Sequence, residues 1–402
     1  MTDRHGLVAS LPHMVLPIQS RSFSVAVATL FLFFLANELP VDVVDGLLFH
    51  GHASARSHSQ LQVSRDIVSS FPSSFENEMS TVDDRIPIRS FPPLEQAIKT
   101  AVLDNQEANR VFHGRGGLFD GCEHITLDWF PPVWLLTSHH IKVFPSELAQ
   151  IQQHLQQQFR LDDDSPPINF VYQHRTINST ASTQVLCGSV PEPHVVTENG
   201  MKFYISLLQG QNQGIFLDMK NGRDWVRRNA SGKIVLNLFA YTCGFSIAAL
   251  MGGATEVINM DMARGCLKMG QRNHELNDVS DGSRARFFAH DIFKSWGKIR
   301  KLGPYGMIVV DPPSYQKGSF VAKDDYRKII KRLPGFLEDN GLVMLCLNAP
   351  ELDSAWLQEE VTQAAPELTF VERLASPSNF PAKDSERALK VLVYKKSPKN
   401  WD

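Results

Sequence analysis

Three carboxylates follow successive apolar runs in the second half of the chain: Asp261, Asp291 and Asp311. A carboxylate that ends a strand can accept hydrogen bonds from both hydroxyl groups of a ribose, as we expect at Asp261. It can also accept from the amino group of an adenine, as we expect at Asp291. Either residue alone is equally well explained as a solvated strand end. Their occurrence together, on successive strands, favours a site that binds a nucleoside.

A tight turn, residues 240–244, precedes these carboxylates. It joins the apolar run Ile234–Phe239 to small apolar residues that begin at Ser246 and are typical of a helix start. Backbone N–H groups point outward at such a helix N-terminus and can bind a ligand. A pyrophosphate loop needs the pattern G-x-G-x-x-G, whereas this turn contains Gly244 alone. The turn therefore favours a ligand with a nucleoside and a charged amino-acid tail.

The tripeptide Asp311-Pro312-Pro313 is the strongest local motif. Two prolines fix φ and remove N–H donors, so the chain leaves its strand in a rigid, extended form. The preceding carbonyl groups can then accept hydrogen bonds from a base, and Tyr315 offers a face on which a flat base could stack. The alternative is a Pro-Pro loop that merely ends a strand. Asn348 follows the next strand and reaches the same edge of the predicted sheet.

These side chains require a sheet whose strands end at one edge, where ligands bind in doubly wound folds. From residue 234 onwards, apolar runs alternate with helical patterns, which is typical of a parallel sheet. We therefore predict an α/β fold with a doubly wound, seven-stranded, Rossmann-like sheet. Its predicted strands are Ile234–Phe239, Glu256–Asp261, Ala285–His290, Met307–Asp311, Leu342–Leu347, Leu368–Leu374 and Leu389–Tyr394, and its predicted helices are Ser246–Met251, Ala263–Asn277, Asp324–Leu337 and Asp353–Ala364.

A smaller α+β domain is predicted ahead of this sheet, in residues 91–198, with the main domain in residues 199–402. Apolar spacing of helical type occurs at Leu94–Leu103, and a helix rich in glutamine is predicted at Pro145–Leu161. Short runs typical of strands surround the second helix. They are Ile125–Trp129, Val133–Thr137, Ile168–Tyr172 and Thr183–Cys187.

Residues 1–90 differ from the rest and are interpreted as a leader. The apolar run Phe23–Ala36 is shorter than the roughly 20 residues that a membrane-spanning helix needs. Residues 50–78 are rich in Ser, His, Arg and Gln, a composition typical of disorder. Residues 21–39 could act as a signal or anchor, although no A-x-A cleavage site follows, or the run could pack as an extra element. We favour a non-structural leader ahead of a true start at Met79, in a cytoplasmic protein without stable membrane association.

The composition of the 402 residues excludes one class of function. A formal net charge of −3 argues against a protein that binds nucleic acid through bulk electrostatics, so any such contact must come from a local patch. Five scattered cysteines without CxxC spacing indicate a reducing compartment and offer no zinc site. Basic residues near the Asp-Pro-Pro motif could hold phosphates or form a solvated helix face. They are Lys317, Lys323, Arg327, Lys328, Lys331 and Arg332.

The motifs together resemble those of class I S-adenosylmethionine-dependent methyltransferases. Within that class, residues 200–396 are most similar to the large-subunit ribosomal RNA methyltransferases of the guanine-N7 and cytosine-C5 types. The segments that carry the resemblance are Gly214-Ile215-Phe216-Leu217-Asp218 with Arg223, Leu236-Asn237-Leu238-Phe239-Ala240-Tyr241-Thr242, Asp261-Met262, Asn273 with Leu276-Asn277, Asp311-Pro312-Pro313-Ser314-Tyr315, and Asn348.

The resemblance implies S-adenosylmethionine as cofactor, RNA (ribosomal RNA in the related enzymes) as substrate, and no metal. It places the methionine end of the cofactor against the 239–244 turn and the small domain where the family has its RNA-positioning module. The implied cofactor-binding residues are Asp218, Arg223, Asn237, Phe239, Ala240, Tyr241, Thr242, Gly244, Asp261, Met262, Asp291 and Ile292. The implied residues at the target base are Asp311, Pro312, Pro313, Tyr315 and Asn348.

The two branches differ in the atom that is methylated. Cytosine C5 becomes nucleophilic only after a thiolate adds to the ring, so that branch needs an activated cysteine. Cys346 lies two residues before Asn348 and on the same strand face, but a buried structural cysteine is the preferred interpretation. Guanine N7 carries an in-plane lone pair and needs only alignment and exclusion of water. We therefore favour a ring nitrogen.

Three other functions remain open from the sequence. A nicotinamide-dependent oxidoreductase could use the same sheet, although the glycine pattern for its cofactor is missing. A domain that retains the cofactor pocket could serve as a non-catalytic RNA-binding module. A methyltransferase could also act on a protein or a small molecule, although the Pro-Pro-Ser-Tyr loop favours a planar base.

Overall fold

The computed structural model describes residues 89–160, 167–176, 180–280, 284–316 and 320–398, all within one compact unit, residues 84–402. The predicted leader, with its apolar run and the proposed start at Met79, lies outside these ranges.

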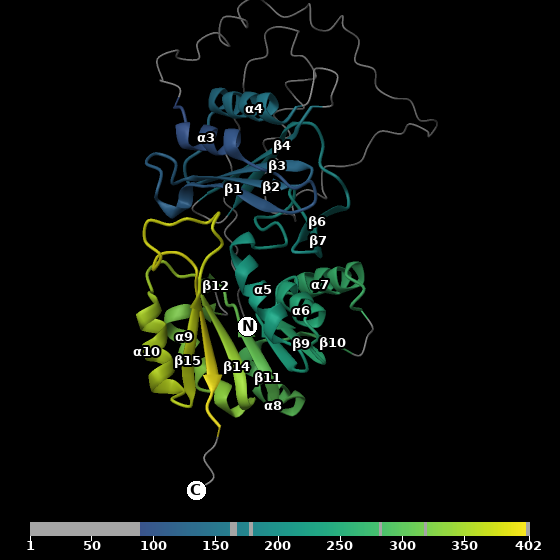
Figure 1. The fold of residues 1–402 in the computed structure, drawn as a ribbon, viewed down its shortest axis with the longest axis vertical. Helices are drawn as coiled ribbons and strands as arrows, with labels where there is room; N and C mark the ends of the chain where they lie inside the picture. The colour runs from purple at the N-terminus through teal and green to yellow at the C-terminus, as the bar shows by residue number, and fades with distance from the viewer. Residues whose placement is uncertain (1–88, 161–166, 177–179, 281–283, 317–319, 399–402) are drawn as a thin grey trace, which may run out of the picture. The chain divides into compact units, whose positions relative to one another are not determined.

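A seven-stranded sheet forms the larger part of this unit (Figure 1). Five neighbouring strands are parallel, whereas β16 runs antiparallel to both β14 and β15. The central strands are mostly apolar because helices cover both faces. In spatial order the strands are β10 (Ala285–Ala289), β9 (Glu256–Asp261), β8 (Ile234–Leu238), β11 (Tyr305–Val310), β14 (Leu337–Leu347), β16 (Lys390–Lys396) and β15 (Leu368–Leu374).

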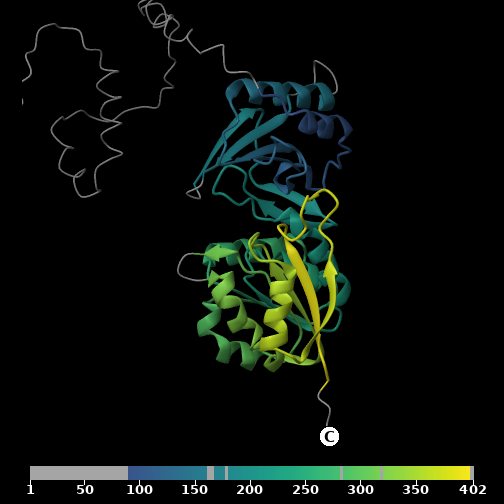
Figure 2. The same ribbon diagram turned by 90° about the vertical axis from the view of Figure 1, so that its left-hand side faces the viewer.

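Within the described ranges, six helices pack against this sheet, three on each face (Figures 1 and 2). The helix predicted to reach residue 337 ends at Ile330, because Pro334 cannot continue it, and β14 begins soon afterwards. One face carries α5 (Lys220–Asn229), α6 (Gly244–Met251) and α7 (Arg264–Leu276), and the other carries α8 (Trp296–Leu302), α9 (Ala322–Ile330) and α10 (Ser354–Ala364).

A five-stranded sheet lies in the N-terminal part of the unit, in the order β1 to β5. All its neighbouring strands are antiparallel except β3 and β4, which are parallel. Helices α3 (Pro92–Thr100) and α4 (Pro145–Phe159) lie on the face that points away from the seven-stranded sheet (Figure 1). The strands are β1 (Asn109–His113), β2 (Ile125–Phe130), β3 (Val133–His139), β4 (Asn169–Arg175) and β5 (Ala181–Cys187).

A hairpin of β6 (His194–Glu198) and β7 (Met201–Ile205) connects the two sheets in the chain. Its inward residues share one hydrophobic core with Val133 and Val171 of the small sheet and with α5 and α6. The predicted boundary at residue 198 falls in the turn of this hairpin, and the division into domains stays a prediction. No helix among the described residues is long and apolar enough to cross a bilayer.

Candidate functional site

A cavity of about 370 Å³ lies at the carboxyl ends of the parallel strands. Its lining brings together the turn at Gly244 and the carboxylates of Asp261 and Asp291, as the sequence predicts. Ligand cavities in proteins commonly start at this size. The predicted residues that line it are Asp218, Arg223, Phe239, Ala240, Tyr241, Thr242, Gly244, Asp261, Met262, Asp291, Ile292, Asp311, Pro312, Pro313 and Asn348.

Asn237 does not line the cavity. Its side chain is buried and donates from Nδ2 to Asn259 Oδ1 at 2.9 Å. The Asn259 amide donates in turn to Ser246 Oγ at 3.0 Å, and this hydroxyl lies 2.8 Å from His274 Nε2. Asn237 therefore belongs to a polar network that fastens α6 and α7 to the sheet.

Tyr315 begins the two-residue strand β12 (Tyr315–Gln316), which pairs with β13 (Phe320–Val321). The structure describes its backbone and not its side chain. The preceding residue, Ser314, donates from its hydroxyl to the carbonyl of Asn348, so the Pro-Pro loop is fastened to the end of β14.

Several lining residues escaped the sequence interpretation. Ala263 and Cys266 lie at the start of α7, soon after Asp261, so helical spacing after a strand end could have indicated them. Phe216 lies within a segment that carried the resemblance, and its ring centroid is 5.4 Å from that of Tyr241. The lining residues not predicted are Asn212, Ile215, Phe216, Met219, Phe245, Ala263, Cys266, Phe293 and Leu389.

The turn after β8 has an unusual backbone. Phe239, Tyr241 and Cys243 adopt positive φ angles of 58°, 47° and 66°, a backbone conformation that residues other than glycine rarely adopt. The N–H groups of Thr242 and Gly244 meet no acceptor among the described residues. Alternating right- and left-handed residues produce concave sets of N–H groups that bind anions. The turn therefore fits the carboxylate of an amino-acid tail.

Asp261 is held in place by backbone donors. Its Oδ2 accepts from the N–H of Tyr241 at 2.9 Å, and its Oδ1 accepts from the N–H of Ala263 at 2.7 Å. Each carboxylate oxygen keeps a second lone pair for a further donor. Asp291 accepts from the N–H of Phe293 at 2.9 Å and lies 3.3 Å from Lys294 Nζ. Both side chains are thus oriented acceptors at the cavity.

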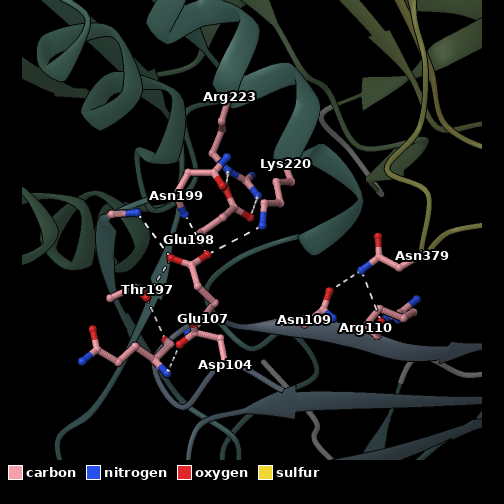
Figure 3. Close-up of polar contacts among 12 residues, drawn as sticks. Asp104, Glu107, Asn109, Arg110, Thr197, Glu198, Asn199, Lys220, Arg223 and Asn379 are labelled. Carbon is pink, nitrogen blue, oxygen red and sulfur yellow. Dashed lines mark hydrogen bonds and ion pairs between the residues drawn. The ribbon is translucent and has the colours of Figure 1, made fainter. Parts of the chain in front are cut away.

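Arg223 reaches the cavity wall from α5 and forms a bidentate ion pair with Glu198 of β6 (Figure 3). Its Nε and Nη2 donate to the two carboxylate oxygens at 2.6 and 2.7 Å. Nη2 also donates to the carbonyl of Phe216 at 2.8 Å. Arg223 therefore connects the β6–β7 hairpin to α5 and to the lining residue Phe216.

Asp218 and Asp311 place two further carboxylates in the cavity lining. Burial, followed by the charge of Asp218, raises the pKa of Asp311 to about 7, although Arg223 and the Cys346 thiol oppose the rise. Burial likewise raises the pKa of Asp218. Two carboxylates with raised pKa values in one cavity favour a cationic ligand, because a positive charge stabilises their ionised forms.

The two cysteines in or near the site, Cys346 and Cys266, have raised pKa values that favour the neutral thiol. Cys346 is fully buried in β14 and does not line the cavity. Burial, and then the nearby charge of Asp311, raises its pKa well above the usual value. Cys266 lines the cavity, and burial raises its pKa as well. A thiol activated for nucleophilic attack requires the opposite shift.

Part of the basic group after the Pro-Pro loop is already paired. Arg327 contacts Glu360 at 3.3 Å, and Lys328 contacts Asp325 at 2.6 Å. Arg332 lies over the ring of Trp296 at 5.0 Å. Lys317 lies outside the described residues. Within the described ranges, no group of three or more His, Cys, Asp or Glu side chains could hold a metal ion.

Parts of this chain are similar in sequence to known proteins. "Ribosomal RNA large subunit methyltransferase I" of Aeromonas salmonicida is 42% identical over 135 residues, which are 33% of this chain and 34% of that protein. The protein of the same name from Erwinia tasmaniensis is 33% identical over 206 residues, 49% of this chain and 52% of the relative. The matches thus span about half, or less, of these relatives.

Among solved structures, a methyltransferase in complex with SAH superposes with a TM-score of 0.64 and 27% identity, over 76% of this chain and 80% of the other. A methyltransferase structure from Streptococcus mutans superposes with a TM-score of 0.63 at 24% identity, over 76% of this chain and 82% of the other, which supports the fold. The model of one protein family matches residues 109–395, most of the chain. The chain belongs to the S-adenosylmethionine-dependent methyltransferases.

Proposed function

We propose that this protein transfers a methyl group from S-adenosylmethionine to a nucleobase of RNA, and that this RNA is ribosomal. The observation that carries the proposal is a single cavity lined by Asp261, Asp291, Gly244 and the Asp311-Pro312-Pro313 segment. The names of the two relatives, both ribosomal RNA methyltransferases, support the choice of RNA.

The donors and acceptors of the cavity fit this cofactor. Asp261 would accept from the ribose hydroxyls, and Asp291 from the adenine amino group. The N–H groups of Thr242 and Gly244, which have no partner among the described residues, would donate to the carboxylate of the methionine part. Asp218 would lie close to the positively charged groups of the cofactor. When bound, the cofactor supplies an electrophilic methyl group on a positively charged sulfur.

The Pro-Pro segment and Asn348, which also line the cavity, would meet the target base. We infer that the methylated atom is a ring nitrogen. Such an atom already carries a lone pair in the plane of the base, so the protein has only to orient the base and exclude water. A carbon target would require a thiolate, whereas burial keeps the thiol of Cys346 neutral.

The test uses ribosomal RNA from cells that lack the protein. The RNA is incubated with the purified full chain and S-adenosylmethionine with a labelled methyl group, then digested and mapped by mass spectrometry. We expect one modified nucleotide that is also present in RNA from cells with the protein and absent without it. Label in protein or in small molecules, with none in RNA, would contradict the proposal.

Asp261→Asn is the loss-of-function variant for this assay, and Asp278→Asn is its matched control. Asp278 is exposed on the surface after α7, and its backbone has a positive φ of 55°, which asparagine tolerates well. Both substitutions remove one carboxylate charge. We expect the control to methylate RNA like the unmodified protein, and Asp261→Asn to lose most of its activity at limiting cofactor.

A further inference from the structure

One face of the five-stranded sheet is polar over half of its extent. Its strand pairing places Arg110 opposite Asp128, and His139 opposite Arg175. Residues on this same face at the other end of the sheet, such as Val171, join the core shared with the hairpin and α5. The polar half of the face is therefore on the side of the seven-stranded sheet, away from α3 and α4.

Hydrogen bonds connect this polar half-face to the segment that enters the cavity wall. Gln173 donates from Nε2 to the carbonyl of Gly210 at 3.2 Å, and Arg175 donates from Nη2 to Gln213 Oε1 at 3.3 Å. The next residues along the chain include Ile215, which lines the cavity. Burial raises the pKa of the lining residue Tyr241 to about 12, and the charge of Arg175 is among the smaller contributions that oppose this rise.

Three guanidinium groups gather here: Arg110, Arg115 and Arg175, called the arginine cluster below. Arg110 is neutralised by Asp128 through bonds of 2.7 and 2.9 Å. Arg175 contacts the neutral amides of two glutamines. Arg115 is exposed and makes no hydrogen bond or ion pair with any described residue. The cluster therefore carries more positive charge than its own carboxylate can balance.

The environment of the cluster makes this excess charge unfavourable. The pKa of Arg175 is lowered to about 10, chiefly by burial and also by the charges of Arg115 and Arg110, although the charge of Asp128 opposes the shift. Although the side chain of Arg115 reaches the surface, the protein atoms around it and then the charge of Arg110 lower its pKa, whereas Asp218 of the cavity raises it. The hydrogen bonds from Gln173 to Gly210 and from Arg175 to Gln213, on either side of the lining residue Asn212, place the cluster beside the cavity. An anion bound between the arginines would relieve their repulsion.

A loop that follows β15 holds part of the cluster in position. Phe380 lies under the Arg110 guanidinium, 4.6 Å from it. Asn379 donates to the side chain of Asn109 and to the carbonyl of Arg110 (Figure 3). Lys383 donates from its N–H to the carbonyl of Gly116 at 2.8 Å, next to Arg115. The arrangement is thus built by parts of the chain that lie some 270 positions apart.

We propose that Arg115 and Arg175 bind the phosphates that flank the target nucleotide of the RNA. This inference rests on the proposed function. Guanidinium groups bind phosphate oxygens through paired N–H donors, and contacts to phosphates position a nucleic acid without reading its sequence. Because the arginine cluster adjoins the cavity, phosphates held there would place the intervening base at the Pro-Pro segment. A local cluster also explains how a chain of net charge −3 binds RNA.

The test compares Arg115→Gln, Arg175→Gln and the double variant with Arg228→Gln. Arg228 is an exposed arginine of α5 outside the cluster, with a surface partner, Asp224, at 3.1 Å. Affinity for a single-stranded ribosomal RNA fragment is measured at several salt concentrations, alongside affinity for SAH. We expect each cluster variant to lower RNA affinity and to reduce the salt slope of log K by about 0.7 for each phosphate that it no longer neutralises. SAH binding and the Arg228 variant should remain unchanged.

The double variant could bind RNA with the affinity and salt slope of the unmodified protein while SAH binding stays normal. That result would overturn this inference and leave the proposed function standing. Failure of the unmodified protein to methylate any RNA would instead overturn the proposed function. Polyglutamate serves as a probe for an acidic protein partner. Competition by polyglutamate as strong as that of RNA would also contradict the assignment of the arginine cluster to RNA.

Discussion

Glu198 and Arg223 form a bidentate ion pair from which solvent is almost excluded, with 0% and 4% of their surfaces exposed. One partner belongs to the hairpin and the other to the cavity wall, so the pair fixes the wall relative to the hairpin (Figure 3). A buried ion pair adds little net stability, but removal of one partner leaves an uncompensated charge.

Glu198→Ala should therefore destabilise the fold by about 3–5 kcal/mol and weaken SAH binding, because Arg223 loses its position. Urea unfolding of the full chain measures the first effect, and calorimetric titration measures the second. Asp224→Ala is the control, since it breaks the exposed pair with Arg228 and should cost about 0.2–1 kcal/mol. Equal, small losses in both variants would show that the buried pair does not hold the wall.

Asp311 should make cofactor binding depend on pH. Its pKa of about 7 means that the carboxyl group loses its proton as the pH rises from 6 to 8. The added negative charge attracts a cationic ligand, so we expect S-adenosylmethionine to bind more tightly at pH 8 than at pH 6. Asp311→Asn should flatten this part of the profile. A profile that is as steep in the variant as in the unmodified protein would assign the titration to another group.

The same group should affect the stability of the ligand-free protein. A carboxyl group whose pKa is raised on folding binds its proton more tightly in the folded state. Its contribution to the free energy of unfolding therefore falls as the pH rises from 3.8 towards about 7. We therefore expect Asp311→Asn to unfold at a higher temperature than the unmodified protein at pH 8. The difference should shrink towards pH 4. An equal difference at both pH values would contradict the raised pKa.

Cys346→Ala separates the two kinds of target atom. If a ring nitrogen is methylated, the variant should retain its rate of methyl transfer within a few-fold and lose only about 1 kcal/mol of stability through the small cavity left behind. Loss of turnover with normal SAH binding would instead identify a carbon target that needs the thiolate. Cys122→Ala, at a buried cysteine near the start of β2, controls for the change in packing.

The central strands of the main sheet, β8, β9, β11 and β14, could be predicted because each is largely buried and therefore contains a short apolar run, whereas the edge strand β15 is largely exposed. Strands β9 and β15 were predicted with the bounds that the structure shows. The carboxylates at strand ends were predictable for the same reason, since their positions follow from those of the strands. Asn237 was misplaced by this logic. It lies inside β8, where its side chain donates to Asn259 of the neighbouring strand β9 and does not reach the cavity.

The arginine cluster could not be predicted from the sequence. Arg110, Arg115 and Arg175 are brought together by the order and register of the small sheet, and short apolar runs do not specify which strands become neighbours. Helix α5 was also missed. Its sequence is so polar that only Trp225 and Val226 mark a buried side, and its packing depends on contacts with α6 and the hairpin.

Calorimetric titration with SAH, comparing Asp261→Asn with Asp278→Asn, tests the central claim most directly. The claim is that the cavity at the strand ends holds the cofactor through Asp261. We expect one SAH per chain for the unmodified protein and for the control. Loss of a hydrogen bond to a charged group should weaken binding to Asp261→Asn by about 1.5–3 kcal/mol, roughly 10- to 150-fold. Absence of binding to the unmodified protein, or equal affinity in both variants, would contradict the account.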